Sequence, residues 1–196
     1  MNNLGPDYIF DSNINPLELQ SIVKELEEYM MRTLDAEDRD LIRRTPKTHS
    51  PITTNIHSKY NILTYPDKII SKLYQSISDA FYSIKPDGNY FIKMWLNVFK
   101  SYQYLPYHKH MQQNIDAFYG HVSIKGGGIT TYNNINTDET FDYKNKDGFF
   151  VLSRPCNDIQ HRTRPQSEER VTFGFDIANI NFIDKDTKPF NFWVPL

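Results

Sequence analysis

Residues 89–100, NYFIKMWLNVFK, and residues 170–178, RVTFGFDIA, decide the fold of this chain. Both stretches are rich in aromatic and β-branched residues and have the period-two pattern of strands whose faces differ in chemistry. Five shorter runs of the same kind lie between them: IDAFYGHVSIK, ITTYN, ETFDYK, FFVLS and IQHRT. Turn sequences such as GGG (126–128) and NKDG (145–148) separate these runs. The pattern predicts a set of antiparallel strands from residue 89 onward.

The N-terminal half has the longer period of helices. In residues 15–34, Pro16 suits the first helical position, and apolar residues recur at roughly helical spacing. Residues 65–84 predict a second helix with Ile69, Leu73, Ile77 and Phe81 along one stripe. Residues 35–59 contain two prolines and no sustained period, so they predict a long connection that could cover a site, with the charged run 37–44 as a helix end.

This order of elements predicts one α+β domain spanning residues 1–196. A helical part of about residues 16–85 would support an antiparallel β-sandwich or barrel core of about residues 89–180. A chain of 196 residues is long enough to bury one core.

Composition narrows the classes of partner. The chain has 22 Lys and Arg against 24 Asp and Glu, so no overall positive field draws it to nucleic acid or anionic lipid. Cys156 is the only cysteine, which excludes an intramolecular disulfide and suits a reducing compartment. The sequence contains neither a secretory signal pattern nor a long apolar run, so we expect a cytoplasmic protein with no membrane partner. The sequence leaves the oligomeric state open, with a homodimer as one option.

Polar residues recur at defined places in the strand region. His108 and His110 flank Lys109 in LPYHKH, and strand alternation would turn both imidazoles to one side and Lys109 to the other. Such a pair alone is common on half-exposed strands. Further along, His161 lies in one predicted strand, and the next places Arg170, Thr172 and Gly174 on a single face. Asn97 interrupts an otherwise apolar strand, so it needs a partner if it is buried.

The ordered set Asn97, His108, His110, His161, Arg170 and Thr172 resembles the iron(II)- and 2-oxoglutarate-dependent oxygenases. Over residues 93–178 the sequence motifs resemble those of small oxygenases of marine bacteriophages and bacteria. In order, these motifs are W-x-N, H-x-H, DGFFVLS, HR and RVTFGFD. The resemblance implies a double-stranded β-helix (jelly-roll, cupin-like) core, and the host cytoplasm as the location if the chain is phage-encoded.

The same resemblance implies the site and its reaction. His108, His110 and His161 would bind Fe(II), while Arg170, Thr172 and Asn97 would bind 2-oxoglutarate. The enzyme would use dioxygen to hydroxylate an unidentified organic substrate or peptide side chain, releasing succinate and carbon dioxide. The residue types suit this chemistry, because non-haem iron needs facial ligands with open positions, and a guanidinium can bind the far carboxylate of the keto acid with two hydrogen bonds.

His110 departs from the family pattern, which has an acid at this position. Three neutral imidazoles leave the metal more positive and also resemble the three-histidine sites of cupin dioxygenases, which use no 2-oxoglutarate. Asp116 could supply the acid instead if residues 110–116 loop back. Two other functions therefore stay open, a cupin-like metal dioxygenase and a catalytically silent jelly-roll binding module. His121 could be a core residue, a neighbour of the ligands or a substrate contact.

Overall fold

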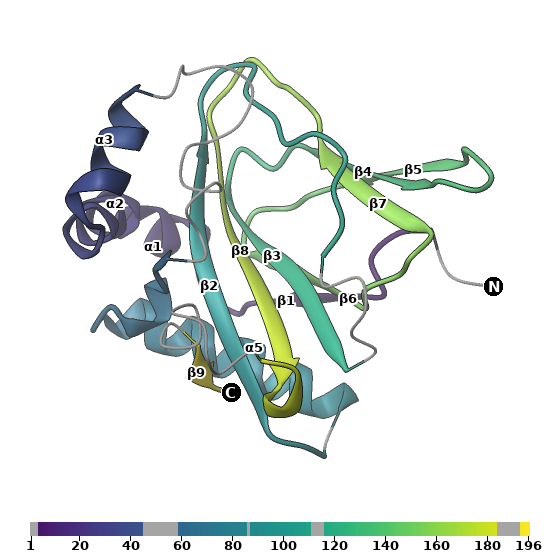
Figure 1. Cartoon of the computed structure of the whole chain (residues 1–196), viewed down its shortest axis with the longest axis horizontal. Helices are drawn as coiled ribbons and strands as arrows, with labels where there is room; N and C mark the ends of the chain where they lie inside the picture. The colour runs from purple at the N-terminus through teal and green to yellow at the C-terminus, as the bar shows by residue number, and fades with distance from the viewer. Residues whose placement is uncertain (1–3, 45–58, 86, 111–115, 184–192) are drawn as a thin grey trace.

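The computed structural model describes residues 4–44, 59–85, 87–110, 116–183 and 193–196. Helices pack on one face of a large sheet, and a small sheet lies across its other face (Figure 1). His49, His57 and most of the predicted 35–59 connection fall outside the described residues. Among the described residues, no helix has both the length and the apolar character needed to cross a bilayer.

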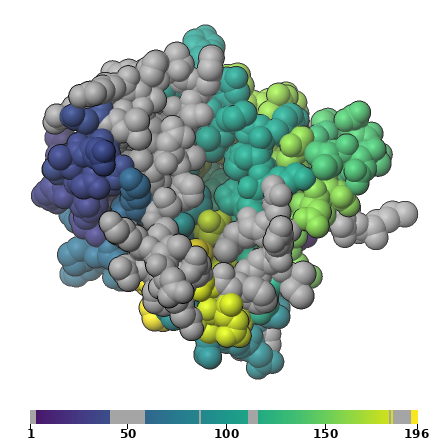
Figure 2. Space-filling view, in the orientation of Figure 1, coloured from purple at the N-terminus to yellow at the C-terminus, as the bar shows by residue number. Residues whose placement is uncertain are grey.

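The large sheet has six antiparallel strands in the order β1-β6-β3-β8-β2-β9. They are β1 (Tyr8–Asp11), β6 (Phe149–Ser153), β3 (Ala117–Lys125), β8 (Arg170–Asn179), β2 (Tyr90–Phe99) and β9 (Val194–Pro195). The small sheet has the order β5-β4-β7, formed by β5 (Thr140–Lys144), β4 (Ile129–Asn134) and β7 (Ile159–Thr163). The β4–β5 hairpin projects from the body of the molecule (Figure 2). All seven predicted strands are present, and the predicted α+β jelly-roll class is confirmed. The strands β1 and β9 lie outside the predicted core range.

The helices fill the N-terminal part. Among the described residues they are α1 (Pro16–Ser21), α2 (Val23–Thr33), α3 (Ala36–Arg44) and α5 (Lys68–Ile84). The short 3-10 turn η2 (Ile62–Thr64) precedes α5, and a second, η3 (Ile180–Phe182), follows β8. The first predicted helix is divided at Ile22 into α1 and α2. The charged run 37–44 of the long connection was predicted as a helix end, and it lies in a separate helix, α3. The Asp35 side chain accepts a hydrogen bond from the Asp38 amide, and buried Asp38 pairs with Lys59.

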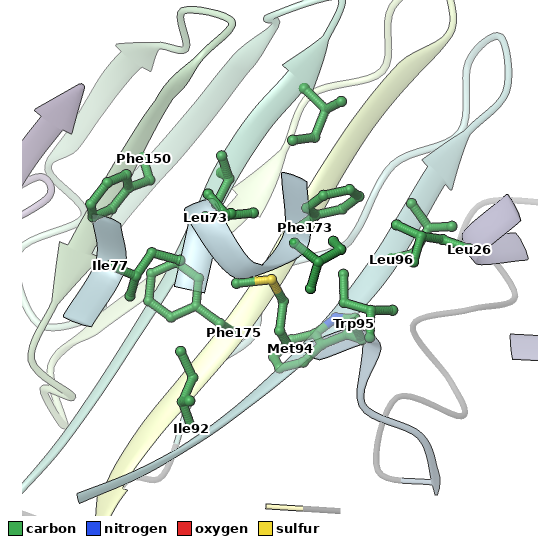
Figure 3. Packing of buried hydrophobic residues seen from close by; sticks show 14 of the residues in the cluster. Leu26, Leu73, Ile77, Ile92, Met94, Trp95, Leu96, Phe150, Phe173 and Phe175 are labelled. Atoms are coloured by element: carbon green, nitrogen blue, oxygen red, sulfur yellow. The ribbon is translucent and has the colours of Figure 1, made fainter. Parts of the chain in front are cut away.

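Helix α5 packs against the large sheet through one apolar stripe. The Asp67 carboxylate caps its first turn by accepting from the amides of Ile69 and Ile70. The buried residues are Ile70, Leu73, Ile77 and Phe81, so Ile70 takes the place predicted for Ile69. Figure 3 shows Leu73 and Ile77 beside Met94, Phe173 and Phe175, which come from β2 and β8.

The register of β2 and β8 separates the core from a polar face. Met94 pairs with Phe175 and Leu96 with Phe173, and all four side chains are buried in the core beneath the helices. The alternate positions pair Asn97 with Thr172 and Phe99 with Arg170. Because side chains alternate across a strand, these residues face the small sheet. The large sheet therefore has an apolar face toward the helices and a face with polar groups toward the small sheet.

Candidate metal and anion site

Three histidines meet between the two sheets. His161 lies on β7, and His108 forms a single antiparallel bridge with it: the His108 amide donates to the His161 carbonyl at 2.9 Å, and the His161 amide donates back at 3.0 Å. His110 joins them, and potential ligand nitrogens of the three lie within 4.8 Å of one another. The H-x-H segment is thus held by one bridge and not by a strand, yet the imidazoles of His108 and His110 both lie beside His161.

Hydrogen bonds set the orientation of two of these imidazoles. The His108 Nδ1 lies 2.8 Å from the Pro106 carbonyl oxygen, which can only accept, so Nδ1 carries the proton. The His110 Nδ1 lies 2.9 Å from Oδ1 of Asp176 and donates to that carboxylate. In both rings Nε2 is then the nitrogen without a proton, the arrangement typical of metal-binding histidines.

The third imidazole is held in its neutral form. His161 is buried, and the cost of burying charge, together with the nearby His108 and His110, holds its pKa well below the usual value of 6.5. Tyr119 on β3 stacks on His161 with ring centroids 5.2 Å apart and on His110 at 4.6 Å. The tyrosine ring therefore restricts the rotation of two imidazoles at once.

Two further sequence predictions concern residues near the histidines. Lys109 was predicted to turn away from the cavity; it is one of the residues that line the cavity, while its Nζ donates to the Asn157 carbonyl in an exposed hydrogen bond. The segment pairs as a strand only at the His108 bridge, so alternation alone does not fix the direction of the Lys109 side chain. Asp116, the alternative acid, accepts from the Tyr90 hydroxyl at 2.7 Å and pairs with Lys85 at 3.2 Å. Its carboxylate is not a member of the histidine cluster.

Arg170 occupies another wall of the same cavity. Its side chain is only 2% exposed, and Nη2 donates a long hydrogen bond of 3.5 Å to Thr130 Oγ1. Within the described part of the chain, Nε and Nη1 have no hydrogen-bond partner. Burial lowers the pKa of this guanidinium to about 10. The centre of the Phe99 ring lies 5.4 Å from the guanidinium carbon Cζ. A buried cation with two unused donors is suited to an anionic ligand.

Thr172 and Asn97 lie next to this arginine along the strands. The Asn97 side-chain amide donates to Thr172 Oγ1 at 3.4 Å, and both residues are buried. Since the threonine oxygen accepts this bond, its own proton is available for a ligand. The predicted group of Asn97, Arg170 and Thr172 is thus brought together on one wall of the cavity.

A polar group that the sequence did not assign completes this wall. The Asn145 amide nitrogen donates to Thr130 Oγ1 and to the Gly128 carbonyl, so its oxygen accepts from His121 Nε2 at 2.6 Å. Burial and the positive charge of Arg170 lower the pKa of His121 to about 4, so the imidazole is neutral at pH 7. His121 faces Gly174 in the β3–β8 register, a signal that appears only once the strand pairing is known.

One cavity of about 260 Å³ joins the histidines to the Arg170 wall. Trp95 lines it, and Gly174 on the paired strand provides the room: a Cβ at this position would lie 2.7 Å from the indole. Asp176 is the only acidic side chain among the described residues of the lining. Asp176 lies on the same strand face as Arg170, Thr172 and Gly174. Strand alternation therefore predicts its side chain in the site, although Asp176 was not among the site residues predicted from the sequence.

The same fold occurs in solved structures of two prolyl hydroxylases and a non-haem monooxygenase. A prolyl-4-hydroxylase of Pseudomonas putida superposes with a TM-score of 0.59 at 8% identity, over 88% of this chain and 84% of that one. The viral collagen prolyl hydroxylase of Paramecium bursaria Chlorella virus-1, solved with 2-oxoglutarate, gives 0.59 at 12% identity, over 88% and 95%. A non-haem monooxygenase, ThoJ in complex with nickel, gives 0.54 at 16% identity, over 87% and 72%.

The sequence itself matches less. No family model matches the chain, and no curated protein matches it. The likeness therefore lies in the fold, which is the jelly-roll that the motif resemblance implied.

Proposed function

We propose that this chain is an Fe(II)- and 2-oxoglutarate-dependent oxygenase that hydroxylates a C–H bond of its substrate. One observation carries the proposal: the buried Arg170 guanidinium, with two unused donors, lies in the same cavity as three clustered histidines. A bare metal site needs no buried cation beside it, because a cation disfavours metal binding. A metal chelated by an acid with a second carboxylate accounts for both groups.

The donor set fits the metal. Three neutral imidazoles offer three nitrogen ligands, a type that suits iron among other first-row metals. His108 and His110 would bind through Nε2, since each uses Nδ1 as a donor elsewhere. We propose His108, His110 and His161 as the metal ligands.

The opposite wall fits the far carboxylate of 2-oxoglutarate. Arg170 would donate to it from Nε and Nη1, and the Thr172 hydroxyl and Asn97 amide would support it. Trp95 and Phe99 also line the cavity and would limit the access of water. When bound, iron and 2-oxoglutarate would supply the oxidising power: one oxygen atom of dioxygen would enter the substrate as hydroxyl, the other would enter succinate, and carbon dioxide would leave.

The size of the cavity bears on the substrate class. At about 260 Å³ it is smaller than the roughly 300–1,000 Å³ typical of pockets for drug-sized ligands. A small keto acid and the tip of a side chain suit this space better than an entire organic molecule. Two of the similar structures are prolyl hydroxylases. We therefore propose a peptide or protein side chain as the substrate.

The proposal is tested by loading metal and keto acid together. Apoprotein is incubated with Fe(II) without oxygen, its metal content is measured, and 2-oxoglutarate binding is titrated by calorimetry. On admitting air, we expect slow succinate formation even without substrate. His161→Ala should lose metal, and Arg170→Met should keep metal but lose 2-oxoglutarate. Metal binding without 2-oxoglutarate binding in the wild type would favour a cupin-like three-histidine dioxygenase, and binding of neither would favour a silent binding module.

A further inference from the structure

The charge of the proposed metal site is unusual for its chemistry. A divalent metal bound by two histidines and one carboxylate has a net charge of +1, whereas three neutral imidazoles leave it at +2. The Arg170 side chain lines the same cavity, and Lys109 is also one of its lining residues. The site therefore concentrates positive charge, which opposes the binding of a further cation.

Asp176 is placed to offset this charge. Its Oδ1 accepts from His110 Nδ1 at 2.9 Å, and the two side chains are only 10% and 15% exposed. A buried ion pair or charged hydrogen bond is screened little by solvent. Asp176 does not belong to the cluster of candidate ligands, so its charge reaches the metal position through the imidazole.

We infer that Asp176 is a positioning residue that supplies, through His110, the negative charge missing from the three-histidine metal site. The carboxylate fixes the His110 tautomer with Nε2 toward the metal position and increases the electron donation of that nitrogen. Asp176 and His110 together then replace the single carboxylate ligand that His110 displaces. This inference rests on the proposed function only in requiring that a divalent metal binds the histidines.

Lys93 supports this assignment from the other side of Asp176. The two residues are register partners on β2 and β8, and Lys93 is buried with its ammonium 5.1 Å from the Trp193 ring and 5.8 Å from the Trp95 ring. Burial lowers the pKa of Lys93, while the charge of Asp176 raises it. The aromatic faces stabilise the ammonium, which balances Asp176 when no metal is present. Lys93 and a metal at the histidines thus interact with the same carboxylate.

The test is a double-mutant cycle read by Co²⁺ binding. Wild type, Asp176→Asn, His110→Asp and the double variant are titrated with Co²⁺ by calorimetry, and the visible absorption of bound Co²⁺ is recorded. An asparagine can still accept from Nδ1, so this change removes charge with little change of shape. We expect Asp176→Asn to weaken Co²⁺ binding by about 10- to 100-fold and to alter the spectrum. In the His110→Asp background, where a carboxylate can ligate directly, the same change should weaken binding by less than about 3-fold.

Two further variants separate charge from folding. Lys93→Met keeps the apolar stem and removes the opposing cation, so it should strengthen Co²⁺ binding severalfold. Asp142→Asn removes an exposed carboxylate that pairs with Arg164, and it should leave Co²⁺ affinity unchanged. Thermal unfolding of each apoprotein shows which variants are folded.

The outcomes are distinct. An equal loss from Asp176→Asn in both His110 backgrounds, or weaker Co²⁺ binding in Lys93→Met, would overturn the inference in favour of a purely structural role. Unchanged Co²⁺ affinity and spectrum in Asp176→Asn would overturn it as well, while leaving the proposed function intact. Failure of the wild type to bind Co²⁺ at all would overturn the proposed function and this inference together.

Discussion

Replacing Arg170 by methionine should make the protein more stable and, at the same time, less able to bind 2-oxoglutarate. The guanidinium is buried without partners for Nε and Nη1 among the described residues, and burial lowers its pKa to about 10 from 12.5. At about 1.4 kcal/mol per pKa unit, this burial costs on the order of 3 kcal/mol. The Phe99 ring offsets about 1 kcal/mol. We expect Arg170→Met to raise the free energy of unfolding by about 2 kcal/mol in the absence of ligand.

The affinity should change in the opposite direction. Losing one partner of a buried, hydrogen-bonded charge pair costs about 2 to 5 kcal/mol, which corresponds to a loss of at least about 30-fold in 2-oxoglutarate affinity. Arg170→Lys should restore only part of it, since an ammonium cannot form the paired hydrogen bonds of a guanidinium.

Urea unfolding without ligand measures the first effect, and calorimetric titration of 2-oxoglutarate into the Mn²⁺-loaded protein measures the second. A variant that is less stable than wild type and binds 2-oxoglutarate equally well would refute the reasoning, because Arg170 would then be a structural residue.

Three other changes have expected outcomes of the same kind. The folded-state pKa of His121 is about 4, below its unfolded value of about 6.5, so the protein loses stability as pH falls through this window. Between pH 7.5 and 5, the free energy of unfolding measured in urea should fall by about 1 to 2 kcal/mol more for the wild type than for His121→Gln. An equal loss in both would show that His121 protonates freely when folded. Gly174→Ala should destabilise by about 1 to 3 kcal/mol in thermal unfolding and change the fluorescence of Trp95, because the new methyl would lie 2.7 Å from the indole. Wild-type stability and fluorescence would mean that the indole moves aside without cost. For His110, alanine should weaken metal binding measured as iron stoichiometry, whereas aspartate should keep it, since a carboxylate can take the same position. If the alanine variant holds iron as tightly as wild type, His110 is not a ligand.

The sequence predicted the part of the fold that local pattern controls. The β2 and β8 strands alternate along their length, so the buried positions of Met94 and Phe173 and the site face with Arg170 and Thr172 follow from one rule. Strand β1 was missed because only four residues form it, and its pairing with β6 is a tertiary contact. Local pattern carries no information on such a distant partner.

For the candidate site too, the sequence predicted what local pattern controls and missed what depends on tertiary contacts. Alternation from Arg170 extends to Asp176, but its role depends on His110 reaching β8 from another segment. Likewise, the tautomer of His121 depends on Asn145, a residue in a loop with no motif. The types of the side chains were visible in the sequence, whereas the contacts that give each its task were not.

The paired backbone bonds between His108 and His161 have a consequence for how the proposed metal would bind. These bonds join two candidate ligands that are far apart in sequence, so neither imidazole is in place until the chain has closed this long connection. Once it is closed, main-chain pairing holds both rings without any ion. The polypeptide should therefore finish folding first and bind the proposed metal afterwards, unlike small zinc domains, whose folding requires the ion. Removing the metal with a chelator should leave the circular dichroism unchanged, and adding it back should restore the site without a refolding delay.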